Sequence, residues 1–71
     1  MEFTIEVHSW LGESMVDFLS DQDGINIESY VIDPDGTGRD LICGTTIGWS
    51  IPTLEEMIIG CDIPKSMFKI S

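Results

Sequence analysis

Apolar residues change their spacing near residue 10, and this change constrains the fold more than any other feature of the sequence. Over residues 2–10 apolar and polar side chains alternate strictly, which is the pattern of a strand with one buried face. From Leu11 onward apolar residues recur every three or four positions. This spacing predicts a short amphipathic helix over about residues 12–20, ended by Asp23 and Gly24. The chain therefore begins with a strand followed by a helix.

Two further strands are predicted on either side of a tight turn. Residues 25–32 match a second strand, and residues 39–48 match the return strand of a hairpin. Residues 33–38 join them: Pro34 presets φ, the side chain of Asp33 can bond the backbone ahead, and the glycines accept positive φ. The first of these strands is expected to face the core with Ile25, Ile27 and Val31. One face of the return strand carries Leu41, Cys43, Thr45 and Ile47.

The second half of the chain predicts a second helix and a last strand. Pro52 suits the start of a helix, and Thr53 with Glu56 can form a capping box, in which each side chain bonds the backbone near the other. Gly60 is suited to end this helix. The tail from Ile63 carries Ser66, Phe68 and Ile70 in alternation, which indicates a short last strand with Lys65 and Lys69 outside that face.

Together these segments predict the order β-α-β-β-α-β in a single compact acidic domain that spans residues 1–71. This order matches the split βαβ, ferredoxin-like arrangement, in which two helices cover one face of a four-stranded antiparallel sheet. The expected fold class is therefore α+β. The helices are short for that arrangement, and a β-rich sheet with one helix is the alternative.

The cysteines and the N-terminal sequence bear on where the protein works. Cys43 and Cys61 are too far apart for a CxxC motif, and both have apolar neighbours. We expect them to be reduced and buried in the same core as Ile47 and Ile58, although a disulfide would also suit so small a chain. No stretch approaches the roughly 18–20 apolar residues of a membrane span. The first residues also lack the basic and apolar regions of a secretory signal, so we expect a cytoplasmic protein.

Acidic residues are concentrated in the first part of the chain. Ten of the thirteen Asp and Glu residues lie in residues 1–40, where Arg39 is the only base, so this segment carries a formal charge of −9. Residues 41–71 carry only −1. Because 42% of the residues are hydrophobic, the chain is expected to fold rather than stay disordered. A net charge of −10 on so small a domain opposes compaction and favours association with a basic partner.

Three carboxylates recur at helical spacing. Glu13, Asp17 and Asp21 stand at i, i+4 and i+8, about 6 Å apart along the helix axis. Each like-charged pair costs roughly 0.2–0.5 kcal/mol, and no lysine lies between them. This ladder is either a solvated helix face or a ridge that binds a partner. The predicted partner-binding residues are Glu13, Asp17, Asp21, Asp23, Glu28, Asp33, Asp35 and Asp40, with Trp10 as the apolar anchor.

No pattern in the sequence predicts catalysis or a bound cofactor. The segment from Asp33 has oxygen-bearing residues at positions 1, 3 and 5 of a calcium loop, but its position 12 is Gly44 instead of glutamate. His8 is the only histidine and alternates with acids on an exposed strand face, and no serine lies in a nucleophile-elbow motif. We therefore expect no enzymatic activity, no metal site and no cofactor.

Three functions are compatible with these features. The first is a small acidic inhibitor that acts as a DNA mimic and occupies the positive groove of a nucleic-acid-binding protein; phage anti-defence proteins, including anti-CRISPR proteins, are often short acidic domains of similar composition. The second is an immunity protein or antitoxin that covers a basic nuclease or toxin. The third is a metal-binding accessory module that uses the carboxylate-rich loops. We expect a basic protein partner, no direct contact with nucleic acid or membrane, and a monomer or homodimer.

Overall fold

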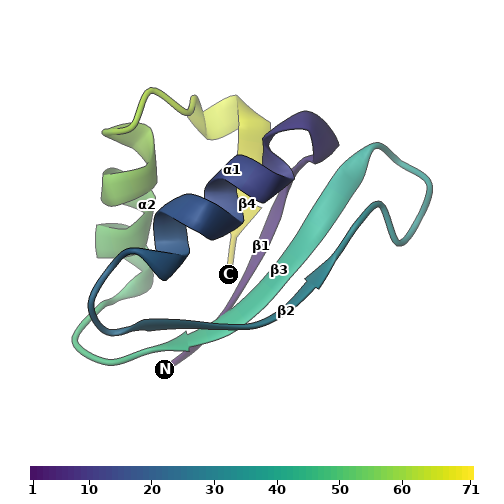
Figure 1. The fold of residues 1–71 in the computed structure, drawn as a ribbon. Helices are drawn as coiled ribbons and strands as arrows, with labels where there is room; N and C mark the ends of the chain where they lie inside the picture. The colour runs from purple at the N-terminus through teal and green to yellow at the C-terminus, as the bar shows by residue number, and fades with distance from the viewer.

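The computed structural model describes all 71 residues and contains two helices and a four-stranded sheet. In chain order the elements are β1 (Glu2–His8), α1 (Ser9–Ser20), β2 (Ile25–Val31), β3 (Arg39–Thr46), α2 (Ile51–Ile59), a 3₁₀ turn η1 (Lys65–Met67) and β4 (Phe68–Ile70). The strands lie in the order β2-β3-β1-β4, and every neighbouring pair is antiparallel (Figure 1). The predicted α+β class is confirmed, and the connections are those of a split βαβ fold, since α1 links β1 to β2 around β3 and α2 links β3 to β4 around β1.

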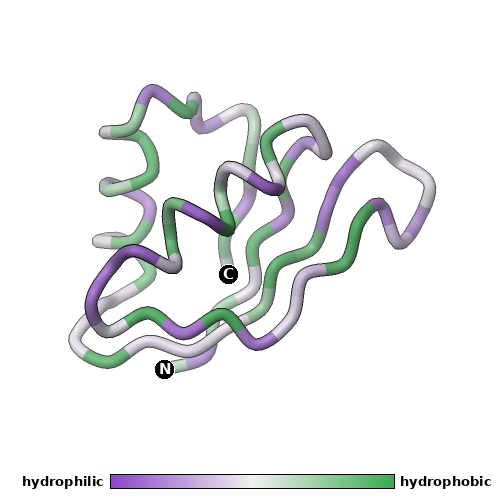
Figure 2. Tube along the Cα trace, viewed as in Figure 1, coloured by the Kyte–Doolittle hydropathy of each residue, from purple (hydrophilic) through white to green (hydrophobic).

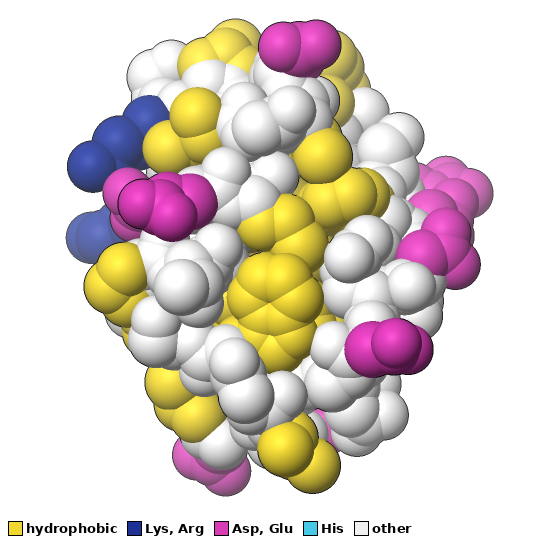
Figure 3. Space-filling model, turned by 90° about the vertical axis from the view of Figure 1, so that its left-hand side faces the viewer, with side chains coloured by type: hydrophobic (Ala, Val, Ile, Leu, Met, Phe, Trp, Pro, Cys, Tyr) yellow, Lys and Arg dark blue, Asp and Glu magenta, His cyan; other side chains and the backbone are white.

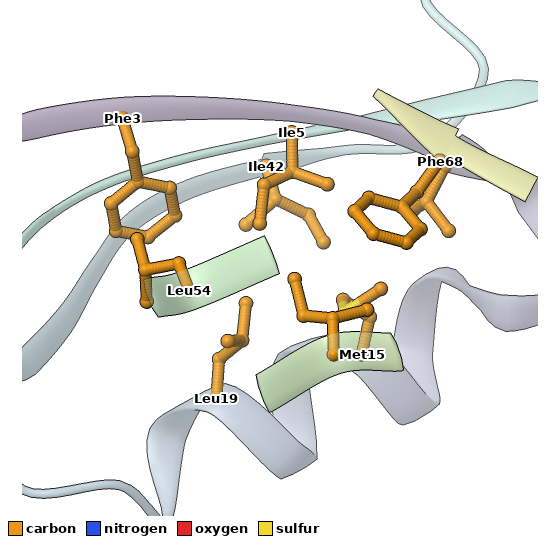
Figure 4. Close-up of a cluster of buried hydrophobic side chains, with 9 residues drawn as sticks. Phe3, Ile5, Met15, Leu19, Ile42, Leu54 and Phe68 are labelled. Carbon is orange, nitrogen blue, oxygen red and sulfur yellow. The ribbon is translucent and has the colours of Figure 1, made fainter. Parts of the chain in front are cut away.

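Both helices pack on the same face of the sheet, and the core lies between these two layers (Figure 1). Side chains from the strands and from the helices point toward one another there (Figure 4). The nine buried apolar residues are Phe3, Ile5, Val7, Ile42 and Phe68 from the strands and Met15, Leu19, Leu54 and Ile58 from the helices. The other face of the sheet carries no helix, and we call it the open face. Neither helix is long and apolar enough to cross a membrane.

The start of α1 and the cap of α2 differ from the sequence patterns, whereas Pro52 lies in the first turn of α2 as predicted. α1 starts at Ser9, directly after β1, rather than near residue 12. The N–H of Ser9 donates a hydrogen bond to the carbonyl of Gly38 (3.0 Å), so a distant loop supplies a partner that the local sequence does not show. In α2 the capping box is formed by Ser50 and Thr53, not by Thr53 and Glu56. The side chain of Ser50 accepts from the N–H of Thr53 (3.4 Å), and the side chain of Thr53 accepts from the N–H of Ser50 (2.8 Å).

A bulge in β2 changes which of its residues face the core. Ile25 and Ile27 face the helices, as predicted, and pack against the core. The register with β3 then shifts because Glu28 is an extra residue. Beyond the bulge Tyr30 packs against the core, whereas Val31 faces away and is 45% exposed, so the prediction for Val31 is wrong. Figure 2 shows that the alternation of hydrophobic and hydrophilic positions along β2 breaks in this segment.

β3 presents to the core the face opposite to the one predicted. Its even-numbered residues are buried beneath the helices, whereas Leu41, Cys43 and Thr45 lie half-buried on the open face. The pairing with β1 requires this orientation, because Ile5 faces the core and lies opposite Ile42. In the sequence both faces of this strand carry apolar residues, so the pattern alone does not distinguish them.

The two cysteines lie outside the core. Cys43 is half-buried on the open face, and Cys61 is exposed in the turn after α2. Ile47, which was expected to share a core with the cysteines, is 86% exposed, whereas Ile58 is buried. The predicted burial of the two thiols is therefore wrong. Both cysteines are free, and no disulfide joins them.

Candidate functional site

Seven carboxylates gather along one edge of the molecule. α1 packs mainly over β2 and β3, so its outer surface and the edge strand β2 form one border of the fold. Neither Lys nor Arg occurs in residues 9–38, which make up this border and its loops. We call this border the acidic edge; all its carboxylates are exposed except that of Asp33, which is half-buried. They belong to Glu13, Asp17, Asp21, Asp23, Glu28, Asp33 and Asp35.

The lysines lie on the opposite side of the sheet. Lys65 in η1 and Lys69 in β4 belong to the edge that β4 forms. Lys65 pairs with Glu55 of α2 at 3.1 Å, and such an exposed pair contributes little to stability. Figure 3 shows basic side chains at the left of the molecule with acidic side chains beside them, further acidic side chains at the right, and hydrophobic side chains between the two sides. The two borders of the sheet therefore differ in charge, with both lysines at the β4 border and the acidic edge at the β2 border.

Two large apolar side chains project near one end of the acidic edge. Trp10, in the first turn of α1, is 72% exposed, and Ile32, directly after β2, is 70% exposed. Neither packs against the core. The sequence predicts Trp10 as the apolar anchor, and the structure leaves this side chain free for contact. The sequence does not single out Ile32, because there it simply continues the pattern of the preceding strand.

Asp40 is buried beneath α1 and is not part of the acidic edge. Its side chain is 1% exposed. One carboxylate oxygen, Oδ1, accepts hydrogen bonds from Ser9 Oγ (2.6 Å) and from the N–H of Asp33 (3.0 Å). The other, Oδ2, accepts from the hydroxyl of Tyr30 (2.5 Å). Because the carboxylate is enclosed and bonded within the fold, the prediction that Asp40 contacts a partner is wrong.

These bonds determine the ionisation of Asp40 and Tyr30. Burial by itself raises the pKa of Asp40, but hydrogen bonds from Ser9, Tyr30 and the backbone of Asp33 outweigh burial and hold this pKa below its usual value. The hydrogen bond to Asp40, with burial and the nearby negative charges of Asp40 and Glu13, raises the pKa of Tyr30 to about 12. At neutral pH the cluster therefore contains a charged carboxylate and a protonated phenol.

Gly12 leaves the space that this carboxylate occupies. A Cβ atom at Gly12 would overlap Oδ2 of Asp40 and the hydroxyl oxygen of Tyr30. The contact joins α1, β2 and β3, so nothing in the local sequence of the helix indicates it. Gly12 is thus required by tertiary packing, although glycine is otherwise unfavourable inside a helix.

The predicted turn at residues 33–38 docks on the same cluster. Asp33 has a positive φ of 46°, and its Oδ1 accepts a hydrogen bond from the N–H of Gly38 (2.9 Å). The backbone of Asp33 bonds Asp40, and the carbonyl of Gly38 bonds the N–H of Ser9. These contacts fix the turn against the start of α1. Trp10 and Ile32 are therefore each adjacent in the chain to a residue that bonds Asp40.

The other end of the acidic edge is held by a second set of bonds. The indole Nε1 of Trp49 donates to the carbonyl of Asp23 (2.9 Å). The N–H of Ile47 donates to the carbonyl of Gly24 (2.8 Å). These bonds join the loop after α1 to the loop after β3, so the carboxylates at both ends of α1 stand on a fixed backbone.

The structure offers no large cavity for a small ligand. One hollow of about 50 Å³ lies where the turn at residues 33–38 meets the open face, and Glu6, Asp35 and Arg39 are among its lining residues. Pockets for small molecules are typically about 300–1,000 Å³. No group of three His, Cys, Asp or Glu side chains is close enough together to hold a metal ion. The acidic edge and its two exposed apolar side chains are the most distinctive surface of the protein.

Comparisons of this chain with protein-family models, with curated proteins and with solved structures found no match.

Proposed function

We propose that this protein binds a basic protein partner through the acidic edge and, by covering the positive groove of that partner, blocks its access to nucleic acid. The observation that carries this proposal is the placement of seven carboxylates along α1, β2 and their loops without an intervening base. Proteins that bind nucleic acids present Lys and Arg to a dense row of phosphates. A rigid row of carboxylates is attracted by the same groove.

The carboxylates of the acidic edge are available for such a contact. None of the seven forms an ion pair within the chain, since the one salt bridge joins Lys65 to Glu55. Only Asp33 uses its side chain in an internal hydrogen bond, and it does so with one oxygen. These charges therefore contribute repulsion to the free protein and attraction to a basic surface.

Trp10 and Ile32 supply an apolar component to the same surface. Large side chains that are exposed in the free protein and surrounded by polar groups often carry much of an interface's binding energy. The carboxylates are expected to accelerate association, and the apolar side chains are expected to slow dissociation. We infer a partner whose positive groove contains or borders an apolar pocket.

The experiment begins with capture of partners from a cell lysate at low salt, followed by purification of any protein that is retained. The purified protein is then tested for direct binding and for displacement of duplex DNA from its groove. The informative variant reverses Glu13, Asp17 and Asp21 to lysine. A matched control reverses Glu2, Glu55 and Glu56, which lie outside the acidic edge. Three reversals of two charges each bring the formal net charge from −10 to −4 in both variants.

The proposal predicts that the variant of the acidic edge loses binding, that the control retains most of it, and that wild-type binding weakens with added salt. Equal loss in both variants would show that only net charge matters. Binding that is unaffected by salt and by the reversal of Glu13, Asp17 and Asp21 would exclude the acidic edge as the contact. If the retained protein is a nuclease or toxin whose gene lies beside the gene of this protein, the function is that of an immunity protein or antitoxin.

A further inference from the structure

The open face differs from the rest of the surface in its charge. It consists of the even-numbered residues of β1, the odd-numbered residues of β3, Lys69 of β4 and, beyond the bulge, the odd-numbered residues of β2. On β1, β3 and β4 the charged members are Glu2, Glu6, Arg39 and Lys69, which sum to zero. The exposed bulge residue Glu28 of β2 adds one negative charge at the border of this face, so most of the formal net charge of −10 resides elsewhere on the molecule.

A small apolar group on β2 and β3 lies on the open face and is incompletely covered. Val31 lies opposite Leu41 in the register, and Cys43 follows on the same face of β3. Val31 is 45% exposed, and Leu41 and Cys43 are half-buried although no helix lies over them. The core of this two-layer fold is on the other side of the sheet, so these side chains do not contribute to it.

From this pattern we infer that the open face packs against the open face of a second copy of the chain and forms a two-fold symmetric homodimer. The acidic edge cannot serve this contact, because it would bring negative surface against negative surface. On the open face, Arg39 and Lys69 form no ion pair within their own chain. Both can therefore meet Glu2 and Glu6 of the second copy, which makes the face complementary to itself.

The size of the face sets the strength of this dimer. Four strands about 4.8 Å apart and three to eight residues long, at about 3.3 Å per residue, cover roughly 400 Å². A standard interface buries about 800 Å² on each partner. The dimer is therefore weak and depends on protein concentration. The acidic edges lie at the side of the sheet and remain free in such a dimer, so the inference does not depend on the proposed function.

The salt dependence separates this association from binding to a basic partner. Two copies that each carry −10 repel one another at long range, and this repulsion is screened beyond about 10 Å at 0.1 M salt. Added salt therefore strengthens the dimer, whereas it weakens binding to a basic partner. A failure of one proposal leaves the other intact.

Sedimentation equilibrium over a range of protein concentrations, at about 0.05 M and about 0.5 M sodium chloride, provides the test. We expect a reversible dimer whose fraction rises with salt. Leu41→Glu places a new carboxylate in the apolar group of this face and should weaken the dimer at least about tenfold. Ile59→Glu makes a comparable apolar-to-acid change at an exposed position of α2, in the helix layer, and should leave the dimer intact. A monomer under all conditions, or a dimer that Leu41→Glu does not weaken, would overturn the inference.

Thiol cross-linking gives a second readout that does not require a charged substitution in the sheet. In Cys61→Ser the only thiol is Cys43 on the open face, and in Cys43→Ser it is Cys61 in the turn after α2. A short bifunctional thiol reagent should join two copies of the first variant faster than two copies of the second, although Cys61 is the more exposed thiol. Faster cross-linking through Cys61 would contradict the inference.

Discussion

Asp40 is a carboxylate removed from water, and burial of such a charge is unfavourable unless donors replace the lost hydration. Here the donors come from three parts of the chain: Ser9 in α1, Tyr30 in β2 and the backbone of Asp33 in the turn. Loss of the Tyr30 hydroxyl would leave the buried Oδ2 of Asp40 without a donor, which typically costs about 1–3 kcal/mol. The stability of the fold is therefore expected to depend on the ionisation of this cluster.

Tyr30→Phe tests that dependence. The pKa of Tyr30 is raised from 10.0 to about 12, so its contribution to stability is complete below pH 10 and is lost as the pH rises toward 12. The pKa of Asp40 is lowered, so its contribution is complete above its ordinary value of 3.8 and is lost as the pH falls through the folded-state pKa. Tyr30→Phe should lower the free energy of unfolding, measured with urea at pH 7, by about 1–3 kcal/mol. The variant should also lack the fall in stability that the wild type shows as the pH rises toward 12.

Tyr30 is the only tyrosine, so the ultraviolet absorbance of tyrosinate reports its titration directly. Titration of the folded wild-type protein near pH 10 would contradict the hydrogen bond to Asp40. A Tyr30→Phe protein as stable as the wild type at pH 7 would show that Asp40 does not need this donor.

Gly12→Ala tests the packing around the same carboxylate. In an ordinary helix this change is stabilising by about 0.5–1 kcal/mol, because glycine loses more backbone entropy on folding. At Gly12 the new methyl group would overlap the side chains of Asp40 and Tyr30, so we expect a loss of about 1–3 kcal/mol. Ser14→Ala, at an exposed position of the same helix, is the control and should change stability little. A gain in stability for Gly12→Ala in thermal unfolding would contradict the described contact.

The helix α1 has an inner face that packs on the sheet and an outer face that carries charge. Its inner face carries Gly12, Met15 and Leu19, which are buried against the sheet. Its outer face carries a ladder of carboxylates without a compensating base. Packing of the inner face stabilises the helix, because an isolated helix of this length is marginal in water. The outer face is therefore free to carry charges that reduce stability and serve recognition.

Asp17→Lys should stabilise the free protein, because it replaces two repulsive i, i+4 pairs with two attractive ones. With each pair contributing roughly 0.2–0.5 kcal/mol, the expected gain in the free energy of unfolding is about 1 kcal/mol at low salt. Urea unfolding measures this gain, and about 1 M sodium chloride should reduce it because the charges are exposed. A destabilised variant would show that Asp17 has a bonding role in the fold that its exposed position does not indicate.

At the scale of the whole molecule, the charge opposes compaction while the small core favours it. The core consists of nine buried apolar side chains, and a chain of 71 residues buries a smaller fraction of its surface than a larger domain does. The net charge of −10 repels itself in the compact state more than in the extended chain. Added salt is therefore expected to stabilise the free protein, because it screens the repulsion among the negative charges.

Thermal unfolding at increasing sodium chloride tests this balance. The midpoint temperature of the wild type should rise as the Debye length shortens from about 30 Å at 0.01 M to about 8 Å at 0.15 M. The variant in which Glu13, Asp17 and Asp21 are reversed should show a smaller rise, since it carries less net charge. A midpoint that falls with salt would indicate that attractive ion pairs, rather than self-repulsion, dominate the electrostatics of the fold.

The order and type of the helices and strands follow from local patterns in the sequence. Alternation over residues 2–10 and the helical spacing from Leu11 are local properties, because a side chain's direction along a strand or helix follows from backbone periodicity alone. Both strands of the hairpin, the turn between them and the second helix were predicted for the same reason. Because α1 packs against β2, the seven carboxylates of these segments lie on one border of the fold.

Tertiary packing determines which face of β2 and β3 is buried and which carboxylate is withdrawn from the surface. The extra residue Glu28 shifts the register of β2 and turns Tyr30 toward the core. The pairing of β3 with β1 buries its even-numbered residues, and Asp40 is among them. Its donors are separated from it in sequence and meet only when α1, β2 and the turn pack together, so no local pattern distinguishes Asp40 from the exposed acids of the acidic edge.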